Sequence, residues 1–178
     1  EKGGRKLSFL FQSTINPVRQ KVQTIFKQAC GKAGIEIELK AVVSAVYFSS
    51  DIGNPDTSGK FWADLQMHTF TRVPDPDRFM QLWVSWEASS KANKWLGLNT
   101  GRWSNAEYDA LFKAQQAELD PVKRAALLIR MNDLVCNDRA MIPVVYRPVV
   151  DGLARNLAAP LSAWDNPLAG LHDWYRES

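Results

Sequence analysis

The sequence is poor in the residues that most often build metal and redox sites. It has only two cysteines, Cys30 and Cys136, and only two histidines among 178 residues. Each cysteine falls within an expected helix, and neither lies at a spacing that suits a set of metal ligands. We therefore expect two free thiols, with Cys30 on the apolar face of its helix, rather than a disulfide or a metal centre.

The sequence also lacks long hydrophobic runs and a strong charge of one sign. No apolar run approaches the roughly eighteen residues that a membrane-spanning helix needs. The 22 Lys and Arg residues are interleaved with 19 Asp and Glu residues, which leaves a net charge of +3. The one basic cluster, at residues 2–6, is too small for a nucleic-acid-binding face. The composition, 46% hydrophobic and 23% charged, is typical of a soluble globular domain.

Sequence patterns of catalysis are missing as well. The two histidines, His68 and His172, lie far apart, and the sequence contains no G-x-S-x-G or H-E-x-x-H pattern. His68 with Asp64 or Asp75 is the one acid–base pairing that the sequence offers, although a single histidine on a strand is more often structural. The sequence therefore favours a binding function over an enzymatic one.

What is present begins with an alternation of strand and helix over the first seventy residues. Residues 7–11 form a short apolar run and residues 35–43 alternate apolar with charged side chains, which predicts two strands. Between them, Asn16-Pro17 supplies an N-cap and a first-turn proline for a helix. Two strands joined by a helix are expected to be parallel, and a third strand is expected over residues 62–70. The apolar stripe of the helix, which we expect to face the sheet, comprises Val18, Val22, Ile25, Phe26, Ala29 and Cys30.

Helices dominate the next part of the sequence. Asp75-Pro76 predicts the start of one helix, with an aromatic-rich stripe through Trp83 and Trp86. A capping box headed by Ser104 predicts the start of a second, and Asp120-Pro121 predicts the start of a third. Because almost no residues separate the second helix from the third, we expect the two to pack antiparallel as a hairpin.

The end of the sequence is less regular. Residues 142–150 have strand character, although their two prolines favour a sheet edge or an irregular crossing segment. The last twenty residues show little periodicity, and we expect them to wrap over another surface. Taken in order, the expected elements predict the α/β class, with a mixed sheet flanked by helices.

Several motifs occur in an order that resembles a known family. A strand ends before Pro74-Asp75-Pro76-Asp77, a helix begins with Asn105-Ala106-Glu107-Tyr108-Asp109-Ala110-Leu111, and Asp120-Pro121-Val122-Lys123-Arg124 leads to Ile142-Pro143-Val144. This order resembles the C-terminal lobe of the periplasmic solute-binding proteins of the peptide/nickel ABC-importer type. The resemblance covers residues 6 to about 155, and it implies one lobe of a type II periplasmic-binding-protein fold whose two lobes close on a ligand.

The resemblance also implies where a ligand would bind. In peptide-binding members, a carboxylate near the end of the strand before the D-P turn holds the α-amino group of the peptide. Aligning Pro76 on the proline of that turn places Arg72 at the carboxylate position. This reversal of charge favours an anionic ligand group over an ammonium group. The alternative is that Arg72 is a solvated turn residue.

The same alignment places further candidate residues on this wall of the cleft. Gln66, Thr69 and Phe70 follow the strand toward the turn, and Asp75 and Trp103 complete the candidate set. Each has a structural alternative: Asp75 as a helix cap and Trp103 as a packing residue are the clearest. No cofactor and no metal is expected.

The function that the resemblance implies is ligand capture for import. The chain is expected to bind a peptide or other small solute in an interlobe cleft and to deliver it, as a monomer, to a membrane permease. We expect residues 1–140 to form the C-terminal ligand-binding lobe and residues 141–178 to return toward an N-terminal lobe. The location is expected to be periplasmic, or lipid-anchored outside the cell where there is no outer membrane. A sensory or protein-interaction lobe is the alternative, and a hydrolase is a weaker one.

The chain begins without an initiator Met or a signal peptide, so we expect it to be part of a longer protein.

Overall fold

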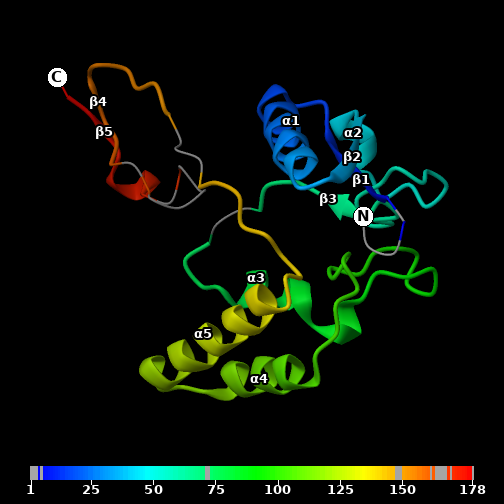
Figure 1. Ribbon diagram of the computed structural model, residues 1–178. Helices are drawn as coiled ribbons and strands as arrows, with labels where there is room; N and C mark the ends of the chain where they lie inside the picture. The colour runs from blue at the N-terminus through cyan, green and yellow to red at the C-terminus, as the bar shows by residue number, and fades with distance from the viewer. Residues whose placement is uncertain are drawn as a thin grey trace.

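A three-stranded parallel sheet organises the first seventy residues (Figure 1). The computed structural model describes residues 4, 6–70, 73–146, 150–160, 162, 168 and 170–177. Strand β1 (Leu7–Thr14) lies in the centre, between β2 (Ile35–Val42) and β3 (Leu65–Gln66). β1 pairs with β2 in parallel along its whole length, and with β3 in parallel over two residues. The expected α/β class and the parallel pairing of the first two strands are confirmed.

Helix α1 (Pro17–Lys32) connects β1 to β2 and begins where the sequence predicts. The Asn16 side chain caps it by accepting hydrogen bonds from the amides of Val18 and Arg19. The predicted inward stripe is only partly right, because Val18 is 52% exposed and Ile25 is 59% exposed.

Two contacts set the rotation of α1 about its axis. Phe26 packs edge-to-face on Phe11 with 5.3 Å between ring centroids, and the buried amide of Gln23 donates to the Phe11 carbonyl at 2.8 Å. Gln23, a polar residue that hydropathy assigns to solvent, therefore lies against the sheet. Part of the apolar stripe is turned outward as a result.

Strand β3 is much shorter than the predicted strand over residues 62–70, and side chains hydrogen-bond to the backbone at both of its ends. Before β3, the Asp64 carboxylate accepts the Leu10 amide at 2.8 Å. After β3, the Ser13 hydroxyl donates to the Met67 carbonyl at 2.7 Å. The chain then leaves the sheet toward residue 70 as irregular backbone.

The first predicted helix of the helical part is broken into short pieces. Helix α2 (Ser44–Tyr47) follows β2, and after β3 come α3 (Asp77–Met80) and two 3-10 turns, η1 (Gln81–Trp83) and η2 (Ser85–Glu87). Val84 is extended between these turns. The Asp109 carboxylate accepts both the amide and the hydroxyl of Ser85, which holds the backbone out of helical register. One continuous helix through Trp86 was therefore a wrong prediction.

The predicted helical hairpin is present. Helix α4 (Ala106–Ala117) and helix α5 (Pro121–Asn137) lie side by side, joined by three residues (Figure 1). Asp120 caps α5 as predicted, whereas α4 is capped by Asn105 instead of Ser104, because the Asn105 side chain accepts the Tyr108 amide. The two helices share one apolar core with the preceding turns, formed by Met80, Trp83, Val84, Tyr108, Phe112, Leu128, Met131 and Val135.

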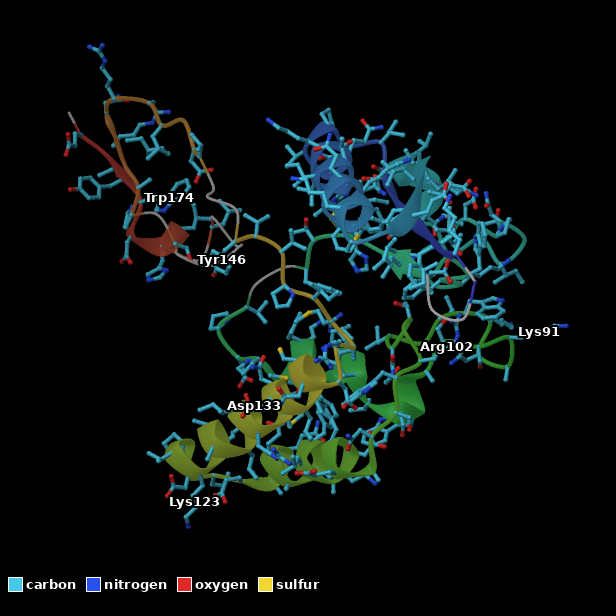
Figure 2. The ribbon with its side chains drawn as sticks, in the orientation of Figure 1. Lys91, Arg102, Lys123, Asp133, Tyr146 and Trp174 are labelled. Atoms are coloured by element: carbon cyan, nitrogen blue, oxygen red, sulfur yellow. The ribbon has the colours of Figure 1, made fainter. Side chains whose placement is uncertain are left out.

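The remaining described residues, 141–177, are called the end segment, and residues 6–140 the packed body. The end segment carries a small antiparallel pair, β4 (Leu157–Ala158) and β5 (Tyr175–Arg176), and one 3-10 turn, η3 (Leu171–Asp173). Figures 1 and 2 show it projecting away from the packed body, with Tyr146 and Trp174 far from the hairpin. Residues 142–146 and 150 form no strand, which matches the irregular crossing segment that the prolines left open, and 147–149 lie outside the described residues.

Candidate ligand-facing site at the strand ends

The parallel strands β1 and β3 bring their carboxyl ends to one edge of the sheet. β1 ends at Thr14, and the chain after β3 reaches Thr69 and Phe70 on the same edge. In open parallel sheets, ligands bind beyond the carboxyl ends of the strands, where successive loops meet. This edge is therefore where the fold favours a binding site.

Arg19 connects the segments at this edge. It lies in the first turn of α1, and its guanidinium donates to the Thr14 hydroxyl at 2.7 Å and to the Thr69 hydroxyl at 3.2 Å. The same group lies 5.9 Å from the centre of the Phe48 ring. A cation, two hydroxyl groups and an aromatic face thus meet at one point.

Aromatic side chains extend this arrangement into a continuous series, here called the aromatic row: Phe48, His68, Phe70, Phe79 and Trp83. Ring centroids are separated by 6.1 Å, 4.5 Å, 5.4 Å and 6.4 Å along the row. The first member is 52% exposed and the last is 8% exposed, so the row runs from the surface into the helical core. Exposed aromatic faces beside hydroxyl and guanidinium groups suit a ligand with both polar and apolar parts.

His68 lies inside the row as a neutral group. Burial, and to a lesser extent the charge of Arg19, lower the pKa of His68 to about 4. Its Nδ1 lies 3.5 Å from the Tyr47 hydroxyl, and burial raises the pKa of that Tyr47 hydroxyl well above its usual range. At neutral pH, His68 therefore contributes an uncharged ring to the site.

The acid–base pairing that the sequence offered is not assembled around His68. Asp64 accepts the Leu10 amide, and Asp75 receives two hydrogen bonds of 2.9 Å from the Arg124 guanidinium. Both carboxylates are thus committed to other partners. Within the described ranges, no group of three or more His, Cys, Asp or Glu side chains could hold a metal ion.

The structure brings three of the six sequence-predicted site residues to the strand-end edge. Phe70 belongs to the aromatic row, Thr69 is exposed beside Arg19, and Gln66 lies in β3, with its amide donating to the Ser58 carbonyl at 3.2 Å. Arg72 lies outside the described residues. A ligand contact for each of them remains a prediction.

The other two predicted residues lie among the helices. Asp75 accepts the Asp77 amide at 2.9 Å and pairs with Arg124. Trp103 packs edge-to-face on Tyr108 at 5.1 Å, and its indole donates to the Asp138 carboxylate at 3.1 Å. The Trp103 geometry matches the packing alternative that the sequence left open. The N-cap position of α3 is Pro76, with no side-chain cap, so Asp75 acts mainly as the ion-pair partner of Arg124.

Sequence reasoning missed Arg19 and Phe48 as site residues, and it considered His68 only as part of an acid–base pair. A signal existed for Arg19, because the predicted cap at Asn16 follows the predicted first strand and so puts the first helical turn at the strand end. His68 and Phe48 depend on how the chain folds after β2 and β3. No local pattern in the sequence indicates that their rings meet.

No protein-family model and no curated protein sequence matches this chain. Solved structures do match it. They belong to the substrate-binding proteins of peptide and nickel ABC transporters. The chain has the fold of part of such a protein. Among the described residues, no helix is both long enough and apolar enough to cross a membrane.

Three of the matched structures show the extent of the likeness. The oligopeptide-binding protein AppA from Bacillus subtilis, in complex with a nonapeptide, is 19% identical, with a TM-score of 0.68 over 100% of this chain and 33% of its own. The oligopeptide-binding protein from Thermus thermophilus, complexed with a pentapeptide, is 21% identical, with a TM-score of 0.64 over 75% and 23%. NikZ from Campylobacter jejuni, in complex with Ni(L-His), is 17% identical, with a TM-score of 0.63 over 79% and 26%. The chain therefore spans about a quarter to a third of the length of these proteins.

Proposed function

We propose that this chain supplies one wall of the interlobe cleft in the substrate-binding component of an ABC importer. The observation that carries the proposal is the meeting of Arg19, Thr14, Thr69 and the exposed end of the aromatic row at the carboxyl ends of parallel strands. The same fold in peptide and nickel–histidine binders supports it. In such a site, a ligand that bridges two lobes shifts an open–closed equilibrium by binding the closed form more tightly.

The ligand class in this proposal is a peptide or another small solute. The matched proteins are complexed with a pentapeptide, a nonapeptide or Ni(L-His). An aromatic wall beside hydrogen-bonding groups suits short peptides, whose side chains are partly apolar and whose backbone is polar. The partner in delivery is a membrane permease, the location is extracytoplasmic, and the protein acts as a monomer without turning its ligand over.

Arg72 keeps its place in this proposal as the residue that the alignment on Pro76 assigns to the family's carboxylate position. A guanidinium there would repel the free amine of a peptide and grip a carboxylate or phosphate in a bidentate manner. With Arg19 at the neighbouring strand end, this edge would carry two cations. The ligand group that it receives would then be anionic.

The division of the chain at residue 140 also belongs to the proposal. Residues 1–140 form the ligand-binding wall, and residues 141–178 return to the second lobe. One observation supports this division: many apolar side chains of the end segment are exposed, Val150 to 91%. Such a segment gains its burial from a surface outside the packed body.

Native mass spectrometry of the intact protein from its source tests the proposal. We expect a one-to-one complex with a small molecule that is released on denaturation. We also expect the 178-residue chain alone to bind that molecule far more weakly, since one wall buries only part of it. Two results would contradict the proposal. One is an intact protein that carries no ligand and binds neither a pentapeptide library nor nickel–histidine, and the other is equal affinity in the isolated chain.

A further inference from the structure

Four polar side chains form a network between the turn before α3 and the helical hairpin, here called the clamp: Asp75, Asp77, Gln115 and Arg124. Arg124 in α5 donates to both carboxylate oxygens of Asp75, at 2.9 Å each. Its Nε also donates to the side-chain oxygen of Gln115 at 3.0 Å. The Gln115 amide in turn donates to Asp77, the first residue of α3.

The clamp joins a surface ion pair to a buried amide. Gln115 is 0% exposed, and the Arg124 side chain is 26% exposed, although Asp75 remains 60% exposed. The hydrogen bonds from Arg124, and then the one from the Asp77 backbone, hold the pKa of Asp75 below its usual range. A bidentate guanidinium–carboxylate pair fixes orientation as well as distance, which an ammonium group does not.

The clamp lies one step from the candidate site. Asp77 begins α3, and two residues later the same short helix carries Phe79, whose ring meets the Phe70 ring edge-to-face at 5.4 Å. Phe70 then contacts His68 at 4.5 Å. Anything that fixes the start of α3 therefore fixes one side of the Phe70 ring.

We propose that Arg124 is a positioning residue of the ligand site: through Asp75, Gln115 and Asp77 it holds α3 so that Phe79 sets the Phe70 ring within the aromatic row. The inference rests on the proposed function only for the role of Phe70 as a ligand contact. The clamp itself acts with or without a ligand. It also gives one physical role to two sequence features that look unrelated, the D-P turn at Asp75-Pro76 and the arginine four residues after Asp120.

Hydrogen–deuterium exchange on the 178-residue chain tests the clamp without any ligand. Arg124→Ala should speed exchange of the amides in residues 77–81 about fivefold, the effect expected for losing a partly exposed bidentate ion pair. Asp75→Asn keeps an acceptor for the Asp77 amide but removes the negative charge. It should speed exchange of the same amides as much as Arg124→Ala does. The double variant should add little, because both changes remove the same interaction.

The chain offers a matched control on the same helix. Arg130 pairs with Glu107 at 2.8 Å, both 51% exposed, and this pair joins α5 to α4 without touching α3. Arg130→Ala should leave amide exchange in residues 77–81 unchanged. Arg124→Lys keeps the positive charge but cannot form the bidentate pair with Asp75. Its exchange rates near the start of α3 should lie between those of the wild type and Arg124→Ala.

Two further readouts separate positioning from general stability. The ring protons of His68, beside Phe70, should shift in the nuclear magnetic resonance spectrum of Arg124→Ala and not in that of Arg130→Ala. In the intact protein, Arg124→Ala should weaken binding of a pentapeptide library several-fold more than Arg130→Ala does. Unchanged amide exchange in residues 77–81 of Arg124→Ala, or exchange that rises equally throughout the chain, would overturn the clamp. Altered exchange in a protein that binds no probe would keep the clamp and reject the proposed function.

Discussion

The packed body and the end segment use similar apolar residues in opposite ways. Every buried core side chain among the described residues lies between Phe11 and Val135, and the end segment has none. Val135 is 2% exposed in the hairpin, whereas Val150 is 91% exposed. Apolar composition alone therefore does not make a core, because a residue is buried only when the chain also supplies a surface to cover it.

The difference follows from what each region can pair with. In the hairpin, three connecting residues bring two apolar helix faces together, so the core is closed locally. The end segment has strand-like residues at 142–146, but no described strand lies beside them. Its exposed apolar side chains fit the proposed return to a second lobe, which would provide the missing surface.

The largest expected effect extends the comparison to the two histidines. His68 is enclosed in the packed body, with its pKa lowered to about 4, and the His172 side chain is 78% exposed in the end segment. The unfolded chain protonates His68 near pH 6.5, but the folded chain resists protonation until about pH 4. The contribution of His68 to the free energy of unfolding should therefore be fully present above about pH 6.5. It should be lost as the pH falls to about 4, which lowers the free energy of unfolding by roughly 3 kcal/mol.

Urea unfolding of the wild type and two variants between pH 7 and pH 4 checks this expectation. Carboxyl groups also titrate in this range, so the informative quantity is the difference between chains. His68→Gln should lose part of the acid-induced destabilisation, and His172→Gln should follow the wild-type curve. If the free energy of unfolding of His68→Gln runs parallel to that of the wild type at all pH values, His68 is not held neutral by burial.

The next prediction compares one substitution in both regions. Val135→Ala removes methyl groups from the closed core and should lower the free energy of unfolding by about 2 kcal/mol, from lost burial and a small cavity. Val150→Ala should change it by less than about 0.5 kcal/mol in the 178-residue chain. Denaturant unfolding of both variants measures the difference. A comparable loss for Val150 would mean that the end segment packs within this chain.

Much of the fold could be predicted because its signals are local. The caps at Asn16 and Asp120 define helix starts through their own side chains, and the alternation over residues 35–43 defines β2. The errors lie where distant groups intervene. Asp109 captures Ser85 and breaks a regular helix, and Asp64 captures the Leu10 amide and shortens β3. A carboxylate that is far away in the sequence leaves no local signal.

The site was predictable only along one segment. The resemblance directed attention to the residues before the D-P turn, and Thr69 and Phe70 do lie at the strand-end edge. The same reasoning could not find Phe48, which comes from a different loop and meets His68 only in the folded chain. Likewise, Asp75 suits both a cap and an ion pair, and only the fold reveals Arg124 as its partner.

The central claim is that the exposed end of the aromatic row receives the ligand, and one matched pair of variants tests it most directly. Phe48 and Trp86 are almost equally exposed, at 52% and 49%, but only Phe48 lies at the strand ends. In the intact protein, calorimetric titration with the molecule identified by native mass spectrometry should show about tenfold weaker binding for Phe48→Ala, or about 1.4 kcal/mol. Trp86→Ala should bind as the wild type does. Unchanged affinity in Phe48→Ala, or an equal loss in both variants, would contradict the account.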